Sequence, residues 1–115
     1  MPNLAILGYG KMGRLIDQLA PEYNFTVTAR IDVNRDEPLS GADVAVEFST
    51  PSAVLDNIRK VSAAGLPLVV GTTGWLDHLA EAKSIIDAGN SALVWSPNFS
   101  VGVNVFTRLV LEAAR

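Results

Sequence analysis

Short apolar runs alternate with segments of helical periodicity along the whole chain. Most of the runs are continuous, which is typical of strands that are buried on both faces of a parallel sheet. The runs predict strands at 4–7, 26–31, 44–48, 67–70 and 92–95. Apolar residues spaced three and four positions apart predict helices at 12–19, 51–64, 76–88 and 101–114.

Strands alternate with helices everywhere except between the second and the third strand. The connection at 33–43 is too short for a full helix, and its segment 34–41 is polar and rich in turn residues, which predicts a loop. Alternating strands and helices imply a parallel sheet with right-handed crossovers. We therefore expect a Rossmann-like, doubly wound α/β fold with three α/β/α layers, whose five strands, numbered along the chain, have the order 3-2-1-4-5.

A glycine-rich turn closes the first predicted strand. Residues 8–13 read Gly-Tyr-Gly-Lys-Met-Gly, a G-x-G-x-x-G that follows a strand and opens a helix, which is the context of a dinucleotide site. In this motif Gly8 permits the tight turn, Gly10 lets a pyrophosphate approach the backbone, and Gly13 lets the helix pack against the strand. The helix start adds free N–H groups and the positive end of its dipole.

Asp32 follows the second predicted strand, about 20 residues past the glycines, where an acid binds the adenosine ribose of dinucleotides. Its carboxylate would accept hydrogen bonds from the ribose hydroxyls and would repel a 2′-phosphate, which favours NAD over NADP. Lys11 and Arg35 lie close by in the sequence, and either cation could pair with a 2′-phosphate. The residues therefore leave the choice between NADH and NADPH open.

Polar residues also close the other three strands. Ser49 and Thr50 follow the third strand and offer hydroxyl groups to the adenosine half of a ligand, and Thr50 also fits the N-cap of the next helix. Gly71–Gly74 has two hydroxyl residues between two glycines, which suits a carboxamide or carboxylate approached by backbone. After the fifth strand, Asn98 offers donors and acceptors, and Phe99 could cover a flat ring.

The composition narrows the class of protein. A chain of 115 residues allows one domain, so we assign 1–115 to a single dinucleotide-binding domain. A net charge of -3 without a basic run argues against nucleic acid, and no apolar run reaches the length of a membrane span. The lack of cysteine excludes a thiol nucleophile and fits the cytoplasm. Because His78 is the only histidine and has no matching acid nearby, we assign neither a metal site nor a catalytic residue.

Four segments together resemble the N-terminal, nucleotide-binding domain of bacterial dihydrodipicolinate reductases, and the likeness runs from Leu4 to Arg115. Residues 8–13 are a variant of that family's glycine loop, and Glu47–Pro51 is similar to its acidic-F-T/S-x-P. Residues 71–74 and 98–104 are similar to its G-T-T-G and N-F-S-V/I-G-V-N, which together are far more specific than a Rossmann motif. The resemblance implies an oxidoreductase domain that takes part in hydride transfer from NADH or NADPH to a cyclic imine or enamine in lysine (diaminopimelate) biosynthesis.

The resemblance also implies a role for each matching residue. The pyrophosphate would be held by Gly8, Gly10, Lys11, Met12 and Gly13. The ribose would be held by Asp32, and the adenosine side would be lined by Phe48, Ser49 and Thr50. The nicotinamide would be placed by Gly71, Thr72, Thr73, Pro97, Asn98 and Phe99. Of these, Thr73 would also lie near the substrate carboxylate.

The chain departs from the family's pattern in two ways. Val33 stands where some members have Arg directly after the ribose acid, which argues against a strong NADPH preference. The family's acid, most of its substrate contacts and its tetramer interface belong to a second domain that would begin just past Arg115, so we expect cofactor binding without turnover. One alternative is a free-standing module that senses NAD(H) without enzymatic activity. Another is a dehydrogenase that acts on aspartate or homoserine, but the sequence of residues 98–104 does not fit such enzymes.

Overall fold

The computed structural model describes residues 2–89 and 91–95. The expected helix 101–114 and the predicted site residues Pro97, Asn98 and Phe99 lie outside the described residues. The described strands are β1 Asn3–Leu7, β2 Thr26–Asp32, β3 Arg35–Asp36, β4 Val44–Glu47, β5 Leu68–Val70 and β6 Leu93–Trp95. The α-helices are α1 Lys11–Leu19, α2 Val54–Ala63 and α3 Leu79–Ala88, and three short 3-10 helices are η1 Ala20–Tyr23, η2 Pro51–Ala53 and η3 Leu76–His78.

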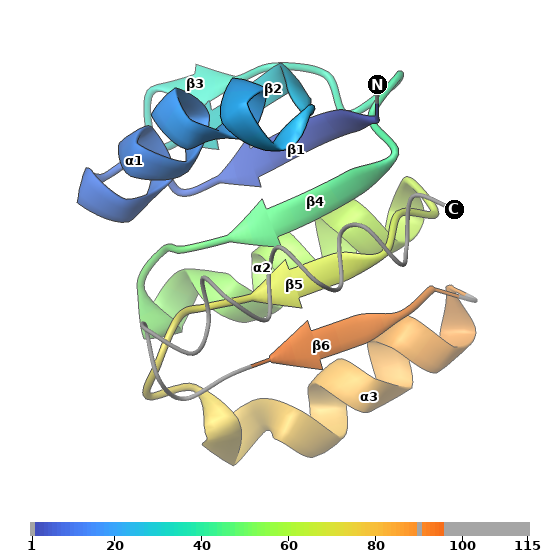
Figure 1. Ribbon diagram of the computed structural model, residues 1–115. Coiled ribbons are helices and arrows are strands. Elements are labelled where there is room, and N and C mark those ends of the chain that lie inside the picture. The colour runs from blue at the N-terminus through green and yellow to red at the C-terminus, as the bar shows by residue number, and fades with distance from the viewer. Residues whose placement is uncertain (1, 90, 96–115) are drawn as a thin grey trace.

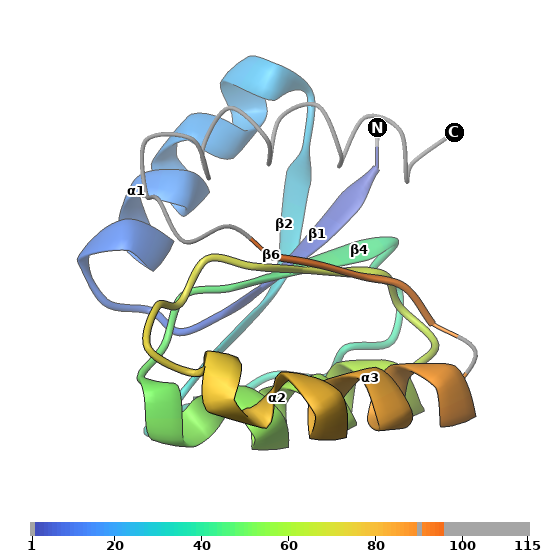
Figure 2. The same ribbon diagram turned by 90° about the horizontal axis from the view of Figure 1, so that it is seen from below.

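The six strands form one sheet with helices on both faces, which confirms the expected α/β class with three layers. α1 covers one face, and α2 and α3 lie side by side on the other (Figures 1 and 2). All strand pairs are parallel except the pair of β2 with β3, which is antiparallel. The expected loop at 34–41 therefore contains a short edge strand that returns along β2.

The strand order is β3-β2-β1-β4-β5-β6, which keeps the predicted numbering and adds a sixth strand. The strand numbered third is, however, a different segment from the one we expected. The predicted segment 44–48 is β4, and it pairs with β1 and β5 in the middle of the sheet instead of lying outside β2. The edge position beside β2 is taken by Arg35–Asp36. These two polar residues have no apolar pattern from which a strand could be predicted.

Alternating residues of the strands supply two cores. One face of the sheet packs on α2 and α3, through residues such as Leu7 and Val70 against Ile58 and Ile86. The other face packs on α1, through residues such as Ile6 and Val46 against Ile16. Because both faces are covered, the strands read as continuous apolar runs.

The capping residues that the sequence predicts, Thr50 and Gly65, lie at the two ends of the segment formed by η2 and α2. Thr50 precedes η2 with an extended backbone, as an N-cap residue does, but its side chain makes no capping hydrogen bond. At the other end Gly65 has a φ of +73°, which suits glycine. The N–H groups of Gly65 and Leu66 donate to the carbonyls of Ser62 and Val61 at 2.9 and 3.2 Å, so the helix ends in a Schellman motif.

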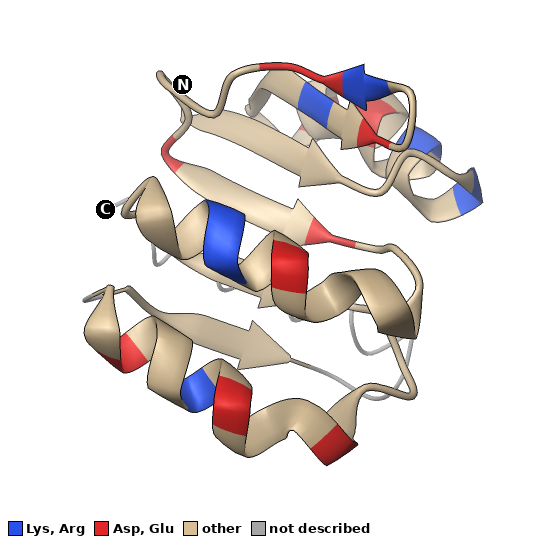
Figure 3. Cartoon of the chain, turned by 180° about the vertical axis from the view of Figure 1, so that it is seen from behind, with Lys and Arg blue, Asp and Glu red and all other residues tan. Residues whose placement is uncertain are grey.

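Basic and acidic residues are interspersed on the outer face of α2 and α3 (Figure 3). The Arg59 guanidinium donates to Glu81 Oε1 at 2.9 Å and so links the two helices. Both side chains are about half exposed, so the pair stabilises the fold by no more than about 1 kcal/mol. Within the described part of the chain, none of the helices has the length and apolarity that a bilayer crossing requires.

The turn at Gly8 gives a stability prediction with a built-in control. Gly8 and Gly41 both have positive φ, +97° and +91°, but a Cβ on Gly8 would lie 2.0 Å from the Phe48 carbonyl oxygen, and one on Gly41 would meet nothing. Gly41→Ala should cost about 1–2 kcal/mol of unfolding free energy from backbone strain alone. Gly8→Ala should cost about 1–3 kcal/mol more, because the backbone must also shift. Equal losses in urea unfolding would contradict this account.

Candidate functional site

A pocket of about 510 Å³ lies at the carboxyl ends of the central strands. The chain runs outward from β1 through β2 to β3, and then crosses back to β4 on the other side of β1. Doubly wound sheets bind ligands at this kind of switch point. The pocket brings together six of the predicted site residues, which are Gly8, Gly10, Asp32, Phe48, Ser49 and Thr50.

The three glycines of the loop have different structural roles. A Cβ on Gly8 would overlap the Phe48 carbonyl, and one on Gly13 would lie 2.1 Å from the Gly8 carbonyl oxygen, so the fold requires both glycines. A Cβ on Gly10 would meet nothing within 4 Å. The missing side chain of Gly10 therefore leaves open space at the start of α1 and is not needed for packing.

The start of α1 is suited to an anion. No side chain caps the helix at Gly10, so the N–H groups of its first turn remain for a ligand. A second hollow, of about 560 Å³, adjoins Gly10 and is lined by Lys11, Arg14, Leu15 and Gln18. Of the remaining loop residues, Gly13 is buried and Met12 is half-buried, so both pack toward the protein interior.

The rim of the pocket at the end of β2 carries both signs of charge. Asp32 is exposed, and its Oδ1 accepts a hydrogen bond from the Val33 N–H at 2.9 Å. Arg35 lies opposite Asp32 in the β2–β3 register. Across the pocket, Lys60 of α2 forms an ion pair with Asp36. The acid expected to bind ribose therefore has Arg35 as its register partner and shares the lining of the pocket with Lys60.

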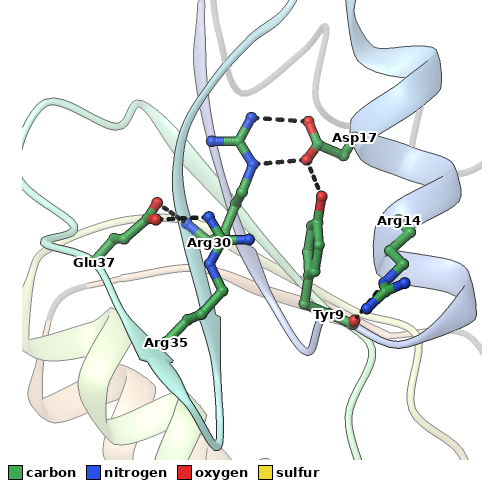
Figure 4. Close-up of polar contacts among 6 residues, drawn as sticks. All are labelled: Tyr9, Arg14, Asp17, Arg30, Arg35 and Glu37. Carbon is green, nitrogen blue, oxygen red and sulfur yellow. Dashed lines mark hydrogen bonds and ion pairs between the residues drawn. The ribbon is translucent and has the colours of Figure 1, made fainter.

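Tyr9 joins the glycine loop to α1 and β2 (Figure 4). Its hydroxyl donates to Asp17 Oδ2 at 2.5 Å, and the guanidinium of Arg30 donates to both oxygens of the same carboxylate at 2.6 and 3.1 Å. The guanidinium carbons of Arg14 and Arg35 lie 5.6 and 5.0 Å from the centre of the Tyr9 ring. The tyrosine, which lines the pocket, is thus fixed by charges on both sides.

These contacts lower the pKa values of the acids in the cluster and raise that of Arg30. The hydrogen bonds from Arg30 lower the pKa of the Asp17 carboxyl below its usual range, and the same pair raises the pKa of Arg30. The hydrogen bond from Arg35, followed by one from the backbone N–H of Arg30, lowers the pKa of Glu37. The acids of the cluster are therefore held ionised at neutral pH.

A buried carboxyl group connects the loops that follow β4 and β5. Glu47 Oε1 accepts a hydrogen bond from the Thr72 hydroxyl, and Oε2 accepts one from the Ser49 hydroxyl. Asn57 Nδ2, on α2, donates to Oε2 at 2.9 Å. The Ser49 N–H donates to Thr72 Oγ1 at 2.8 Å. The hydroxyls of Ser49 and Thr72 are thus engaged inside the protein, whereas Thr50 and Thr73 are exposed.

Gly71 lies directly beneath Phe48. A Cβ on Gly71 would come within 2.0 Å of Phe48 Cε1, so only glycine fits against the ring. The Gly71 N–H donates to the Glu47 carbonyl at 2.8 Å. Neither of the two hollows described above is lined by Gly71, Thr72 or Thr73, which lie one strand further along the sheet.

Sequence reasoning missed several residues that line the pocket at the switch point. They are Tyr9, Ile31, Val33, Ala53, Asp56, Asn57 and Lys60. The last three follow Ala53 at three, four and seven positions, so helical periodicity groups these four on one face of the helix but does not show that this face meets the pocket. Within residues 2–89 and 91–95, no group of three or more His, Cys, Asp or Glu residues is arranged to hold a metal ion.

The sheet order together with the open glycine turn defines the class of Rossmann-like, NAD(P)-binding folds. The crystal structure of a putative homoserine dehydrogenase from Archaeoglobus fulgidus has the same fold, with a TM-score of 0.65 at 19% identity, over 85% of this chain and 43% of that chain. At that identity the likeness shows the fold alone.

The particular family follows from sequence comparison. Residues 31–99 match the family model of the dihydrodipicolinate reductase N-terminus, and the chain belongs to this family. A protein of Christiangramia forsetii named 4-hydroxy-tetrahydrodipicolinate reductase is 40% identical in a 110-residue alignment that covers 93% of this chain and 46% of the relative. A protein of the same name from Cutibacterium acnes is 35% identical in a 120-residue alignment that covers 100% of this chain and 49% of the relative. The chain thus spans about half the length of these relatives.

The Asp17–Arg30 pair gives a prediction of pH dependence. Because folding lowers the pKa of Asp17, the pair stabilises the fold above the unfolded pKa of about 4, and this contribution is lost as the pH falls through the folded pKa. Asp17→Asn should lower the free energy of unfolding by about 1–2 kcal/mol at pH 7, and the difference from wild type should shrink below about pH 4.

Urea unfolding between pH 2.5 and 7 measures this effect. Asp87→Asn, at the exposed end of α3, is the matched control and should follow the wild-type curve. A pH-independent loss in Asp17→Asn would show that the ion pair does not cause the effect.

Proposed function

We propose that this chain binds NADH or NADPH as the cofactor half of a 4-hydroxy-tetrahydrodipicolinate reductase and does not turn over substrate by itself. Family membership and the pocket at the switch point support the proposal. The observation that carries it is the open space at Gly10, where the backbone and the uncapped start of α1 adjoin both hollows. A pyrophosphate needs that combination of close backbone approach and free N–H groups.

The proposed ligand extends in both directions from the glycine loop. Towards β2, the adenosine would lie in the pocket at the switch point, between Asp32 on one side and Phe48, Ser49 and Thr50 on the other. Since the Ser49 hydroxyl donates to Glu47, we expect Ser49 to contact the ligand through its backbone. Towards β5, the nicotinamide would lie against Gly71, Thr72 and Thr73. The sequence adds Pro97, Asn98 and Phe99 to that side.

The chemistry of the proposed reaction is a hydride transfer, which the reduced nicotinamide supplies when it is bound. The residues of this chain would bind the dinucleotide and fix the direction in which the nicotinamide faces. Thr73 is exposed on the loop after β5, and we propose that its hydroxyl reaches the carboxylate of the cyclic imine. We assign no proton donor within this chain.

Calorimetric titration of the chain with NADH, NADPH and the cyclic imine tests the proposal. Heat is the appropriate readout, because Trp75 and Trp95 overlap optically with reduced nicotinamide. Binding of a dinucleotide without binding of the imine would support a cofactor half. Binding of neither dinucleotide would contradict the proposal.

Gly10→Val should abolish dinucleotide binding and leave the chain folded. The side chain would enter the space that the pyrophosphate needs, and its Cβ would meet nothing within 4 Å in the protein. The affinity for NADH should fall at least tenfold, while the unfolding free energy should change by less than about 1 kcal/mol. Ala80→Val, on the exposed face of α3, is the control. Retained affinity in Gly10→Val would show that the glycine loop is only a turn.

Asp32→Ala should weaken NADH binding more than NADPH binding. The carboxylate would accept hydrogen bonds from the ribose hydroxyls of NADH, and such bonds to a charged group contribute about 1.5–3 kcal/mol, or roughly tenfold or more in affinity. For NADPH, the loss is offset by relief of the repulsion with the 2′-phosphate. Calorimetry with both dinucleotides measures the ratio, and Asp87→Ala serves as the control. An unchanged NADH affinity would remove Asp32 from the ribose site.

A further inference from the structure

Glu47 is the one charged residue among residues 2–89 and 91–95 that is fully buried, with 0% exposure. The register places it in the middle of the sheet, between Leu7 of β1 and Val70 of β5. A carboxyl group in that position is unfavourable unless hydrogen-bond donors surround it. An apolar residue would complete the core at lower cost, so the position requires another explanation.

The hydrogen-bond partners of Glu47 all donate to it. The hydroxyls of Ser49 and Thr72 also accept one hydrogen bond each. The Ser49 N–H donates to Thr72 Oγ1 at 2.8 Å, and Asn57 Nδ2 donates to Ser49 Oγ at 3.2 Å. Each hydroxyl therefore accepts one hydrogen bond and donates to Glu47, and the Ser49 hydroxyl has the Thr50 carbonyl at 3.3 Å as a second, longer acceptor. A group that accepts through both oxygens matches this arrangement, whereas an amide would direct its own N–H at a donor.

The network determines how the loop after β5 faces the ligand side. The loop is held twice by Glu47, through its backbone carbonyl on the Gly71 N–H at 2.8 Å and through its carboxylate on the Thr72 hydroxyl. With Thr72 drawn inward to 4% exposure, the next side chain, Thr73, is exposed. The same carboxylate holds Ser49 and Asn57, both of which line the pocket at the switch point.

We propose that Glu47 is a positioning residue of the cofactor site, which sets the loop 71–74 against the nicotinamide end of the ligand. The inference rests on the proposed function and deepens it. The adenosine half depends on the glycine loop, on the end of β2 and on the backbone after β4, which the Phe48 N–H holds to the Leu7 carbonyl at 2.8 Å without the Glu47 side chain. Loss of the carboxylate should therefore affect recognition of the nicotinamide and spare the rest of the dinucleotide.

Glu47→Gln tests the inference when NADH is compared with ADP-ribose, which lacks only the nicotinamide ring. In the full 115-residue chain, the variant should bind NADH roughly tenfold more weakly by calorimetry and bind ADP-ribose as wild type does. A residue that served stability alone would not change the ratio of the two affinities. Glu22→Gln, in the exposed turn η1 at the far end of α1 from the glycine loop, is the matched control and should change neither affinity.

A second set of variants covers the case in which Glu47→Gln does not fold. Thr72→Val removes the hydroxyl that donates to Glu47 and keeps the side-chain volume, so it should lower the NADH to ADP-ribose affinity ratio in the same direction. Thr72→Ser keeps the hydroxyl and should restore the wild-type ratio. Circular dichroism and thermal unfolding establish that each variant is folded before its ligands are compared.

The outcomes separate this inference from the proposed function. A wild-type chain that binds neither NADH nor NADPH overturns the proposed function and this inference with it, and a chain that binds NADPH alone is tested in the same way with NADPH and 2′-phospho-ADP-ribose. If the wild type binds both ligands, an unchanged affinity ratio in folded Glu47→Gln, or in Thr72→Val where Glu47→Gln does not fold, overturns the inference alone. A selective loss of NADH affinity in the same variant supports it.

Discussion

The close approach of three backbone segments at the carboxyl edge of the sheet is the constraint on which the site depends. The turn after β1 lies so near the turn after β4 that Gly8 has no room for a Cβ beside the Phe48 carbonyl. α1 lies equally near the first turn at Gly13, and the Phe48 ring covers Gly71. The first two contacts place the glycine loop and the start of α1 at the pocket, and the third sets the loop after β5 one strand further along the same edge. If any of them opened, the start of α1 and the loop after β5 could no longer contact one dinucleotide, as the proposed function requires.

Glu47 acts at the same edge, but through polar contacts. The glycines allow the segments to approach, and the carboxylate fixes the loops after β4 and β5 once they are close. A buried carboxyl group with several donors is unfavourable to create and also unfavourable to distort, because any loop movement leaves a buried polar atom without a partner. Such a network lowers the stability of the fold relative to an apolar core but fixes one loop arrangement. A site that orients a ligand, as we propose for this one, requires such a fixed arrangement.

The sequence allowed the fold class to be predicted because burial on both faces makes each strand a continuous apolar run. It did not place 44–48 in the middle of the sheet, since strand order depends on tertiary packing and β3 has only two polar residues. That Gly8, Gly10 and Asp32 lie at one pocket could be predicted from spacing and chemistry. Glu47 could not, because its partners Ser49 and Thr72 are 23 residues apart and only the β4–β5 pairing brings them together. Asn57 and Lys60 were missed because the direction of α2 decides which of its side chains reach the pocket.

Local charge and net charge have opposite signs in this protein. The chain carries a net charge of -3, yet the surface beside the glycine loop presents Lys11 and Arg14 together with the positive end of α1. On the opposite rim, Arg35 and Lys60 are paired with Glu37 and Asp36. Lys11 and Arg14, the cations nearest the expected pyrophosphate, thus have no carboxylate partner among the described residues. A polyanion responds to this local field more than to the net charge, so an acidic chain can still attract a dinucleotide to one edge of its sheet.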